Sequence, residues 1–413
     1  MSKKKEKVPI VRFRDFSEPW LKNQLSEVAE FSKGKGYSKK DLKSHGTPII
    51  LYGRLYTNYE SEISNVETYA NLEENSVVSE GGEVIIPASG ESADDISRAS
   101  CVIDRGIILG GDLNIVRPHE YLNSLFIAIT LSNGSQQREL SKRAQGKSVV
   151  HLHNSDLKSV KLFYPSYEEQ TAIGSLFRTI DDLLASYKNN LANYQSLKAT
   201  MLSKMFPKAG QTVPEIRLDG FEGEWEINKL NKYLAVSKQK NTQLKFDKED
   251  VLSVSGEFGI INQIQFQGRS FAGASVEMYS IVDTGNIVYT KSPLKANPYG
   301  IIKTNYGIPG IVSTLYAVYL PNENVFPGFV ERYFENDLRL NSYLKPLVNK
   351  GAKNDMKVSD ENALLGAVIF PQLEEQVAIS DYFTNLDKFI QSHKDKITQL
   401  ETLKKKLLQN MFI

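Results

Sequence analysis

The sequence predicts an α+β protein, in which two homologous mixed α/β domains are separated by an antiparallel two-helix coiled coil with pseudo-two-fold symmetry. Three observations lead to this prediction. A long helix-forming segment occurs twice, a tryptophan-containing motif opens the region before each copy, and these regions mix strand-like with helical runs. An internal repeat of this size sets the architecture before any other feature is considered.

The repeated segment spans residues 164–206 and 370–412. The two copies align without a gap, so that Pro165 recurs as Pro371, 206 positions later. After each proline, two glutamates place negative charge in the first helical turn, where the helix dipole favours it. Apolar residues then recur at alternating steps of four and three. A seven-residue period sustained over this length is typical of a coiled-coil seam.

One seam position in each helix is ambiguous, because it can be filled by Leu197 or Lys198 in the first copy and by Leu403 or Lys404 in the second. Two matching seams in one chain are expected to bury each other. The first helix leads into the second globular region, and that region ends where the second helix begins. Because the ends of a compact domain usually lie close together, we expect the two helices to be antiparallel.

The domains are bounded by a second repeated motif, V-P-x-[VI]-R-[FL]-x-x-F-x-x-x-W, which occurs at residues 8–20 and 213–225. It contains Trp20 and Trp225, the only tryptophans, which we expect to be structural anchors. The predicted organisation is a basic tail, a first domain, the first long helix, a linker, a second domain and the second long helix. Their residues are 1–7, 8–163, 164–206, 207–212, 213–369 and 370–413.

Both globular regions read as mixed α/β domains. In the first, strand-like runs lie within residues 47–56, 76–89 and 100–118, and a helical stretch covers residues 123–144. In the second, strand-like runs with turns lie within residues 251–261, 277–296 and 307–320, and a helical stretch covers residues 329–350. The order of elements is the same although the residues differ, which fits a duplication followed by divergence.

Composition restricts the function classes. The formal net charge is +1, with 50 basic and 49 acidic residues, so any nucleic-acid surface has to be a local basic face. No run of 18 apolar residues predicts a membrane span, and the basic start is unlike a signal peptide. The single cysteine, Cys101, suits a reducing compartment. We therefore expect a cytoplasmic protein.

The repeated motifs carry a resemblance to a known family. The segment P-x-x-E-E-Q-x-A-I opens both long helices, and K-x-x-[ML]-L-x-x-M-F closes both. With a tryptophan-anchored variable domain before each helix, the chain resembles the specificity subunit of a type I restriction–modification system over nearly its whole length.

This resemblance implies two target-recognition domains, each reading one half of a bipartite asymmetric sequence in double-stranded DNA. The helices would set the spacer and dock two methyltransferase subunits, and restriction/translocase subunits would join that core. The subunit itself would be non-catalytic and hold no cofactor, while S-adenosylmethionine, ATP and magnesium would belong to the partner subunits. No membrane is implied.

The catalytic and metal motifs in the sequence are weak. The phosphate-binding pattern G-x-x-x-x-G-K-[ST] is absent. Residues 297–300, Asn-Pro-Tyr-Gly, are similar to the Asn-Pro-Pro-Tyr motif of adenine methyltransferases but lack its second proline, and a turn is the better interpretation. His151 and His153 share one strand face without a further ligand close in sequence, which disfavours a metal site. We therefore expect neither a catalytic residue nor a metal ligand.

DNA contacts require cations for phosphates and amide or guanidinium groups for base edges. Clusters of such residues follow strands or turns in both domains, where loops commonly carry binding residues. In the first domain the candidates are Tyr52, Arg54, Tyr56, Thr57, Asn58, Ser89, Ser92 and Arg98. In the second domain they are Lys238, Lys240, Asn241, Asn262, Gln263, Gln265, Gln267, Arg269, Lys291, Ser292 and Lys295.

Two alternatives belong to other classes of protein. A coiled-coil scaffold or adaptor would share the long helices without reading DNA, and DNA binding by the assembled complex distinguishes it. A self-contained nuclease or methyltransferase would need the catalytic motifs that are missing, and turnover by the isolated chain would support it.

Overall fold

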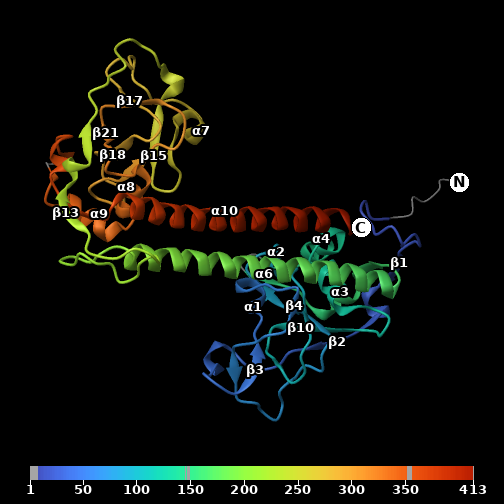
Figure 1. Ribbon diagram of the computed structural model, residues 1–413. Helices are drawn as coiled ribbons and strands as arrows, with labels where there is room; N and C mark the ends of the chain where they lie inside the picture. The colour runs from blue at the N-terminus through green and yellow to red at the C-terminus, as the bar shows by residue number, and fades with distance from the viewer. Residues whose placement is uncertain (1–7, 145, 147–148, 351–355, 413) are drawn as a thin grey trace. The chain divides into compact units, whose positions relative to one another are not determined.

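A computed structural model describes residues 8–144, 146, 149–350 and 356–412 (Figure 1). The predicted basic tail, residues 1–7, lies outside this part of the chain. The molecule divides into two compact units, Met1–Lys188 with Asp395–Ile413, and Asn189–Lys394. We call them unit 1 and unit 2. Each unit contains one globular domain and a section of both long helices.

The two long helices are α6, Tyr167–Lys204, and α10, Leu373–Asn410. Each begins three residues later than predicted, because Tyr164 and Phe370 end strands and a proline follows both. The least exposed residues along each helix keep the predicted seven-residue spacing, which confirms the coiled-coil seam. Within each unit the seam buries one helix against the other.

The ambiguous seam positions are occupied by lysines. The side chain of Lys198 is 17% exposed and that of Lys404 is 25% exposed. The neighbouring Leu197 and Leu403 are 37% and 46% exposed instead. The coiled coil therefore contains a charged residue where a leucine could have packed, and it presents the leucine outward.

Ion pairs give the direction of the helices within each unit. In unit 1, Asp181 of α6 pairs with Lys404 of α10, and Lys188 pairs with Glu401 at 2.8 Å. Later residues of α6 thus meet earlier residues of α10, so the helices are antiparallel as predicted. Unit 2 repeats the first of these pairs, since Lys198 and Asp387 lie 2.6 Å apart and correspond to Lys404 and Asp181.

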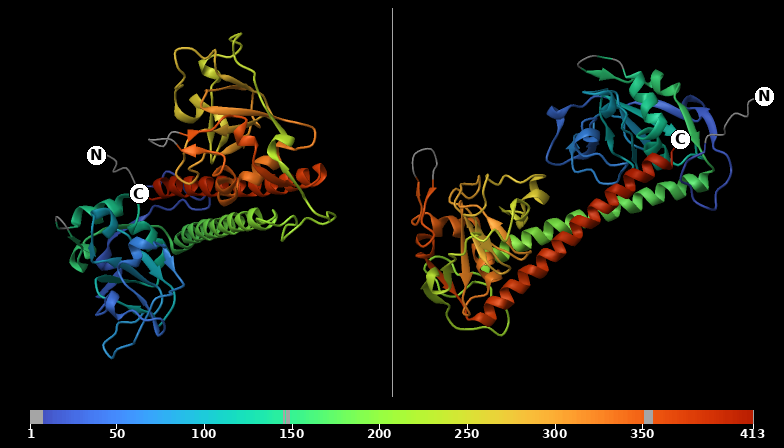
Figure 2. Two further views of the ribbon diagram at one scale, coloured as in Figure 1. Left: turned by 90° about the vertical axis from the view of Figure 1, so that its left-hand side faces the viewer. Right: turned by 90° about the horizontal axis from the view of Figure 1, so that it is seen from above.

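The strands of unit 1 are drawn in blue to green in Figure 2. Among the described residues they form a five-stranded sheet and three smaller ones. The larger sheet has the order β2–β10–β6–β8–β4, with β2 Ala29–Lys33, β10 Leu113–Pro118, β6 Glu83–Pro87, β8 Ser100–Val102 and β4 Glu62–Ile63. The others are β1 Leu21–Gln24 with β12 Lys161–Tyr164, β7 Ser89–Gly90 with β11 Val150–His151, and β3 Thr47–Ile50 between β5 Tyr69–Ala70 and β9 Ile108–Leu109. Its short helices are α1 Arg54–Thr57, α2 Ala93–Ile96, α3 Ser124–Leu131, α4 Gly134–Arg143 and α5 Asn154–Lys158.

Unit 2 is built on a four-stranded sheet, β14–β21–β18–β19. Its strands are β14 Leu234–Val236, β21 Tyr316–Pro321, β18 Ile287–Thr290 and β19 Ile302–Thr304. Four two-stranded sheets join β13 Glu226–Lys229 with β24 Ala367–Phe370, β15 Leu252–Ser255 with β16 Gly259–Asn262, β17 Ser280–Val282 with β20 Gly310–Val312, and β22 Asn349–Lys350 with β23 Met356–Lys357. The helices are α7 Gln263–Gln267, α8 Pro327–Phe334 and α9 Asp337–Leu344.

One predicted element is wrong in part, since the run predicted as strand over residues 47–56 contains β3 and then the helical turn α1. The segment 263–267, for which no element was predicted, forms α7 after the β15–β16 hairpin. Each of the two predicted helical stretches is a pair of helices, α3–α4 and α8–α9, interrupted at Asn133 and Asn336. Asparagine favours such positions because its side chain can bond to the backbone. Among the described residues, no helix is both long and apolar enough to cross a membrane.

Each unit has its core where the globular domain packs on its helix sections. In unit 1, Trp20 packs on Phe126 of α3, and Phe126 also contacts Phe412 after α10. In unit 2, Trp225 packs on Phe329 of α8, and Phe329 contacts Phe206 after α6. Both tryptophans are buried, which confirms that they are structural anchors.

Candidate nucleic-acid interface

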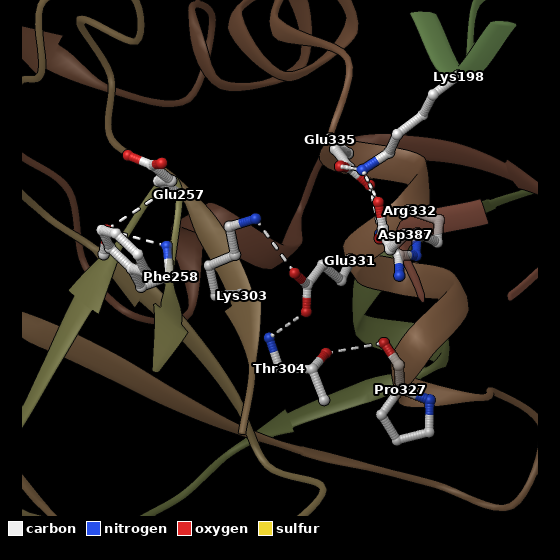
Figure 3. Close-up of polar contacts among 11 residues, drawn as sticks. Lys198, Glu257, Phe258, Lys303, Thr304, Pro327, Glu331, Arg332, Glu335 and Asp387 are labelled. Carbon is white, nitrogen blue, oxygen red and sulfur yellow. Dashed lines mark hydrogen bonds and ion pairs between the residues drawn. The ribbon is translucent and has the colours of Figure 1, made fainter. Parts of the chain in front are cut away.

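The β15–β16 hairpin of unit 2 presents an exposed aromatic residue at its turn. Ser255 Oγ accepts the backbone N–H groups of Glu257 and Phe258 at 3.3 and 3.2 Å. Glu257 and Phe258 are labelled in Figure 3. Gly259 has a φ of +69°, a conformation that glycine adopts without a steric cost. Phe258 is 58% exposed, and its ring lies 5.7 Å from the ring of Phe266 in α7. The hairpin turn and α7 therefore form one surface.

Two of the predicted base-reading residues hold α7 in place instead. The Asn262 side chain accepts the N–H groups of residues 264 and 265 and donates to Glu249 O at 2.6 Å. The Gln263 amide donates to Ser253 Oγ and accepts the N–H of Phe271 at 2.6 Å. Their polar atoms are engaged within the domain, since short helices need side chains to satisfy their free backbone groups.

The other three predicted residues of this segment are exposed. Gln265 and Gln267 are exposed on α7, and Arg269 is exposed in the loop that follows it. The Arg269 guanidinium lies 4.5 Å from the centre of the Phe271 ring, in a cation–π arrangement. Amide and guanidinium forks can read base edges, and exposed aromatic rings can stack on bases. We call this set the α7 surface: Phe258, Gln265, Phe266, Gln267, Arg269 and Phe271.

The aromatic members of the α7 surface were missed by the sequence prediction. Phe258, Phe266 and Phe271 stand in or beside strand-like segments, where phenylalanine usually indicates a core position. A turn signal, Gly256 before Phe258 and Gly259 after it, was the one available indication that Phe258 is at a hairpin tip.

Of the remaining candidates of unit 2, some are exposed and others already bond within the domain. Lys238 and Lys295 are exposed, and Ser292 is half-buried. Lys291 forms an ion pair with Asp360 at 2.7 Å, and Lys240 donates to Ser280 Oγ at 2.9 Å.

Asn241 corrects the prediction made for it. The residue is 1% exposed, and its amide donates to Phe246 O and Val276 O while its carbonyl accepts the Phe246 N–H. Its side chain therefore fixes the loop before β15 and has no free face for a ligand. A buried amide needs such partners, because leaving it unpaired would cost free energy.

In unit 1 the structure brings three of the predicted residues together. Tyr52 and Tyr56 form an edge-to-face pair across α1, and the Tyr56 hydroxyl donates to Ser89 O. Ser89 Oγ lies 3.2 Å from Nδ1 of His151, whose ring stacks on that of His153 at 6.3 Å. Burial raises the pKa of Tyr56, so its hydroxyl stays a neutral donor.

This row of aromatic and hydroxyl groups is the candidate contact surface of unit 1, and the histidines are its unpredicted members. His151 and His153 are exposed, and imidazole can bond to phosphate or base edges. Among the described residues, no group of three or more histidine, cysteine or carboxylate side chains could hold a metal ion.

The other candidates of unit 1 lie around the row or away from it. Arg54 donates to Glu60 and to Asn65 O, which neutralises its charge locally. Thr57 donates to Gly53 O, and Asn58 is exposed at the end of α1. Two further candidates belong to α2 and its end: Ser92 caps this helix through the Asp95 N–H, and Arg98 lies over the ring of Tyr59.

The methyltransferase-like segment at residues 297–300 has a structural role. Asn297 is buried and donates to Asp337 Oδ1 at 2.9 Å, while its carbonyl accepts from Asn341. Both partners belong to α9, so the segment joins the end of β18 to that helix. This agrees with the interpretation as a turn.

A family model and two curated relatives agree with the resemblance that the repeated motifs indicate. Residues 17–194 match the family model described as the type I restriction modification DNA specificity domain. The chain is 23% identical over 324 residues to a putative type I restriction enzyme MjaX specificity subunit of Methanocaldococcus jannaschii, covering 73% of this chain and 70% of that protein. It is 18% identical over 410 residues to the type I restriction enzyme MjaVIII specificity subunit of the same organism, covering 95% and 91%.

A solved structure is similar in fold over the whole chain. The S subunit of a type I restriction–modification system from M. genitalium has a TM-score of 0.59 at 14% sequence identity, covering 98% of this chain and 99% of that one. The likeness confirms the predicted fold class, two mixed α/β domains joined by long helices.

Proposed function

Because this chain belongs to the specificity subunits of type I restriction–modification systems, we propose that it reads a bipartite asymmetric DNA target, one half with each domain. A single observation carries this proposal: the two units share their core contacts, yet they present different surfaces. The α7 surface of unit 2 consists of aromatic rings, amides and a guanidinium, whereas the row in unit 1 consists of tyrosines, a serine and histidines. Different side chains select different bases, so the two half-sites should differ in sequence.

The α7 surface is suited to base reading. The amides of Gln265 and Gln267 can form paired hydrogen bonds with adenine, and Arg269 with guanine. A correct fork contributes about 1–3 kcal/mol of discrimination between bases. Phe258 and Phe266 add exposed ring faces, which can insert at a base step or cover a sugar.

The long helices are proposed to dock methyltransferase subunits. Apolar residues are exposed on both helices at equivalent positions, Leu183 with Phe389 and Leu197 with Leu403. In unit 1, Leu183 and Leu403 lie at the same level of the helix pair, because Asp181 pairs with Lys404. In unit 2, Leu197 and Phe389 stand in the same relation. Exposed apolar positions that recur in a duplicated element fit two copies of one partner.

The catalytic chemistry is proposed to reside in the partners. The chain would contribute recognition and positioning and would itself be non-catalytic. S-adenosylmethionine and magnesium with ATP would be held by the methyltransferase and the restriction/translocase subunits, respectively.

The proposal is tested by mapping adenine methylation in the genome of cells that carry this gene with its methyltransferase gene, against cells in which this gene is deleted. The expected result is a split motif with two defined half-sites and a fixed spacer. Methylation that does not depend on this gene, although a complex with the methyltransferase subunit forms, would contradict DNA reading and support a scaffold without sequence specificity.

A further inference from the structure

Because the chain is duplicated, the two units can be compared residue by residue where the long helices pack on the globular domain of each unit. Gln170 of unit 1 accepts the N–H of Asn123, and Gln376 of unit 2 accepts the N–H of Phe326 in the same way. Phe126 contacts Phe412 just as Phe329 contacts Phe206. Positions of α3 therefore correspond to positions 203 residues later in α8. By this correspondence Ile129 matches Arg332, and Ser132 matches Glu335.

In unit 2 this point is filled by charged side chains. Lys198 lies 2.5 Å from Glu335 and 2.6 Å from Asp387 (Figure 3). Arg332 lies 2.8 Å from Glu335 and 2.7 Å from Asp387. Two cations and two carboxylates thus balance one another, and each cation has two anionic partners. Figure 3 shows the four side chains converging, Lys198 from α6, Arg332 from α8, Glu335 from the residue after α8 and Asp387 from α10.

In unit 1 only two of these four charged residues have charged equivalents. Lys404 pairs with Asp181, which are the equivalents of Lys198 and Asp387. Ile129 and Ser132 occupy the positions of the arginine and the second carboxylate. The Ser132 hydroxyl donates to Ala128 O at 2.8 Å and accepts the N–H of residue 99, so it is directed into the domain. Among the described residues, the seam lysine of unit 1 therefore lacks the second carboxylate that its counterpart has.

The space next to Lys404 is an open cleft with a surplus of positive charge. Its outer part has a volume of about 450 Å³ and lies between the start of α4 and the end of α10. An inner part of about 270 Å³ continues past Lys404 to Arg98. Arg138 and Lys405 line the outer part and are exposed, and its carboxylate, Glu401, already pairs with Lys188. The positive end of the α4 dipole adds to the same field.

We propose that this cleft binds a carboxylate side chain from an acidic segment of a protein subunit that docks on unit 1. Unit 2 indicates that the bound group is a carboxylate, because Glu335 occupies the equivalent position there. Arg98 pairs with Asp95 at 3.6 Å and Lys404 pairs with Asp181, so the complementary charge comes from Arg138 and Lys405. Charge pairing of this kind stabilises and orients a partner. Unit 2 satisfies its own lysine, so the partner would distinguish the two units here.

The proposal rests on the proposed function only for the partner, a methyltransferase subunit. The test measures its affinity for the full chain by isothermal titration calorimetry, with the double variant Arg138→Gln and Lys405→Gln. Both residues are exposed, so the fold should be unaffected. We expect affinity for one partner copy to fall by roughly tenfold. Lys406→Gln is the matched control, because Lys406 is exposed on the same helix but does not line the cleft.

A second probe and a second variant test the cleft independently of the methyltransferase subunit and of the double variant. Poly-L-glutamate should bind the wild-type chain more tightly than the double variant, whether or not a methyltransferase subunit docks. Ser132→Glu supplies the missing carboxylate from within the chain, and it should weaken binding of both probes. Equal binding of both probes to wild type and variants would overturn the proposal.

A DNA duplex carrying the target sequence separates this inference from the proposed function. The double variant should bind the duplex as the wild type does. If it loses duplex binding but keeps partner binding, the cleft is a phosphate site and the proposal is wrong. If no form of the chain, alone or assembled, binds the duplex specifically, the proposed function fails while the poly-L-glutamate result still decides the cleft.

Discussion

At the scale of single residues, the charged seam of unit 2 links the stability of the fold to pH. Glu335 is mostly buried between Lys198 and Arg332. Burial by itself would raise the pKa of Glu335, but the charges of Arg332 and Lys198 outweigh this and hold its pKa below the usual 4.5. A carboxylate with a lowered pKa stabilises the fold at pH values above its ordinary pKa, and this contribution is lost as the pH falls through its folded pKa.

Glu335→Gln should therefore lower the free energy of unfolding at pH 7 by about 1–3 kcal/mol, because two buried cations lose a charged partner. Below pH 4.5 the difference between variant and wild type should shrink, since the carboxylate is protonated first in the unfolded chain and then, below its lowered pKa, in the folded chain. Urea unfolding at several pH values, followed by circular dichroism, measures both effects. Glu323→Gln, at an exposed position, is the control. A difference that stays constant from pH 7 to pH 3 would contradict the assignment.

The same scale explains why the predicted contact residues could be located only as groups. The stretch 262–269 was predicted as one group of contact residues, but Asn262 and Gln263 bond to the backbone while Gln265 and Gln267 are exposed. All four have the same functional group. Which amide bonds within the domain depends on where the five-residue helix α7 begins. Hydrophobic periodicity does not predict the start of so short a helix.

At the scale of secondary structure, the long helices could be predicted from the sequence and the shortest helices could not. The helices α6 and α10 were predicted because a seven-residue period persists along each of them, whereas α1 and α7 are too short to show a period. The period also left one position undecided. The structure places Lys198 and Lys404 in the seam and turns Leu197 and Leu403 outward. A partner that covers these leucines would explain their exposure.

Replacing exposed apolar residues by aspartate tests this docking face. Leu183→Asp with Leu403→Asp should abolish binding of one methyltransferase subunit, and Leu197→Asp with Phe389→Asp should abolish binding of the other. A carboxylate in an apolar contact is costly to desolvate, and all four side chains are at least 37% exposed, so the chain should still fold. Native mass spectrometry of the assembled complex counts the subunits.

The control for this experiment substitutes two exposed polar neighbours, Ser186→Asp with Thr402→Asp, which adds the same charge beside the first pair. It should leave two methyltransferase subunits bound. Full assembly by both apolar-to-aspartate variants would show that the helices dock their partners through another face.

At the scale of the whole molecule, the duplication was the most informative feature of the sequence, since it predicted the antiparallel pairing found in each unit. What it could not predict is where the copies have diverged. The core contacts recur almost position by position, from Arg12–Glu169 and Arg217–Glu375 to Phe126–Phe412 and Phe329–Phe206. The surfaces do not recur, because solvent-exposed positions place few packing constraints on the side chain.

This separation of a repeated core from variable surfaces makes the domains exchangeable. Replacing residues 213–370 by the corresponding domain of another specificity subunit keeps α6 and α10 and their seam, so the hybrid should assemble with the same methyltransferase subunits. Its methylated motif should change in one half-site and keep the other half-site and the spacer length. Methylation mapping of cells carrying the hybrid measures all three.

The reciprocal hybrid, with residues 8–163 replaced, should change the other half-site alone. If either hybrid altered both half-sites, the two domains would not read DNA independently. If the spacer changed while both helices were kept, the helices would not be what sets the distance between the half-sites. Only a change confined to one half-site in each hybrid is compatible with two separate reading surfaces held by a duplicated helix.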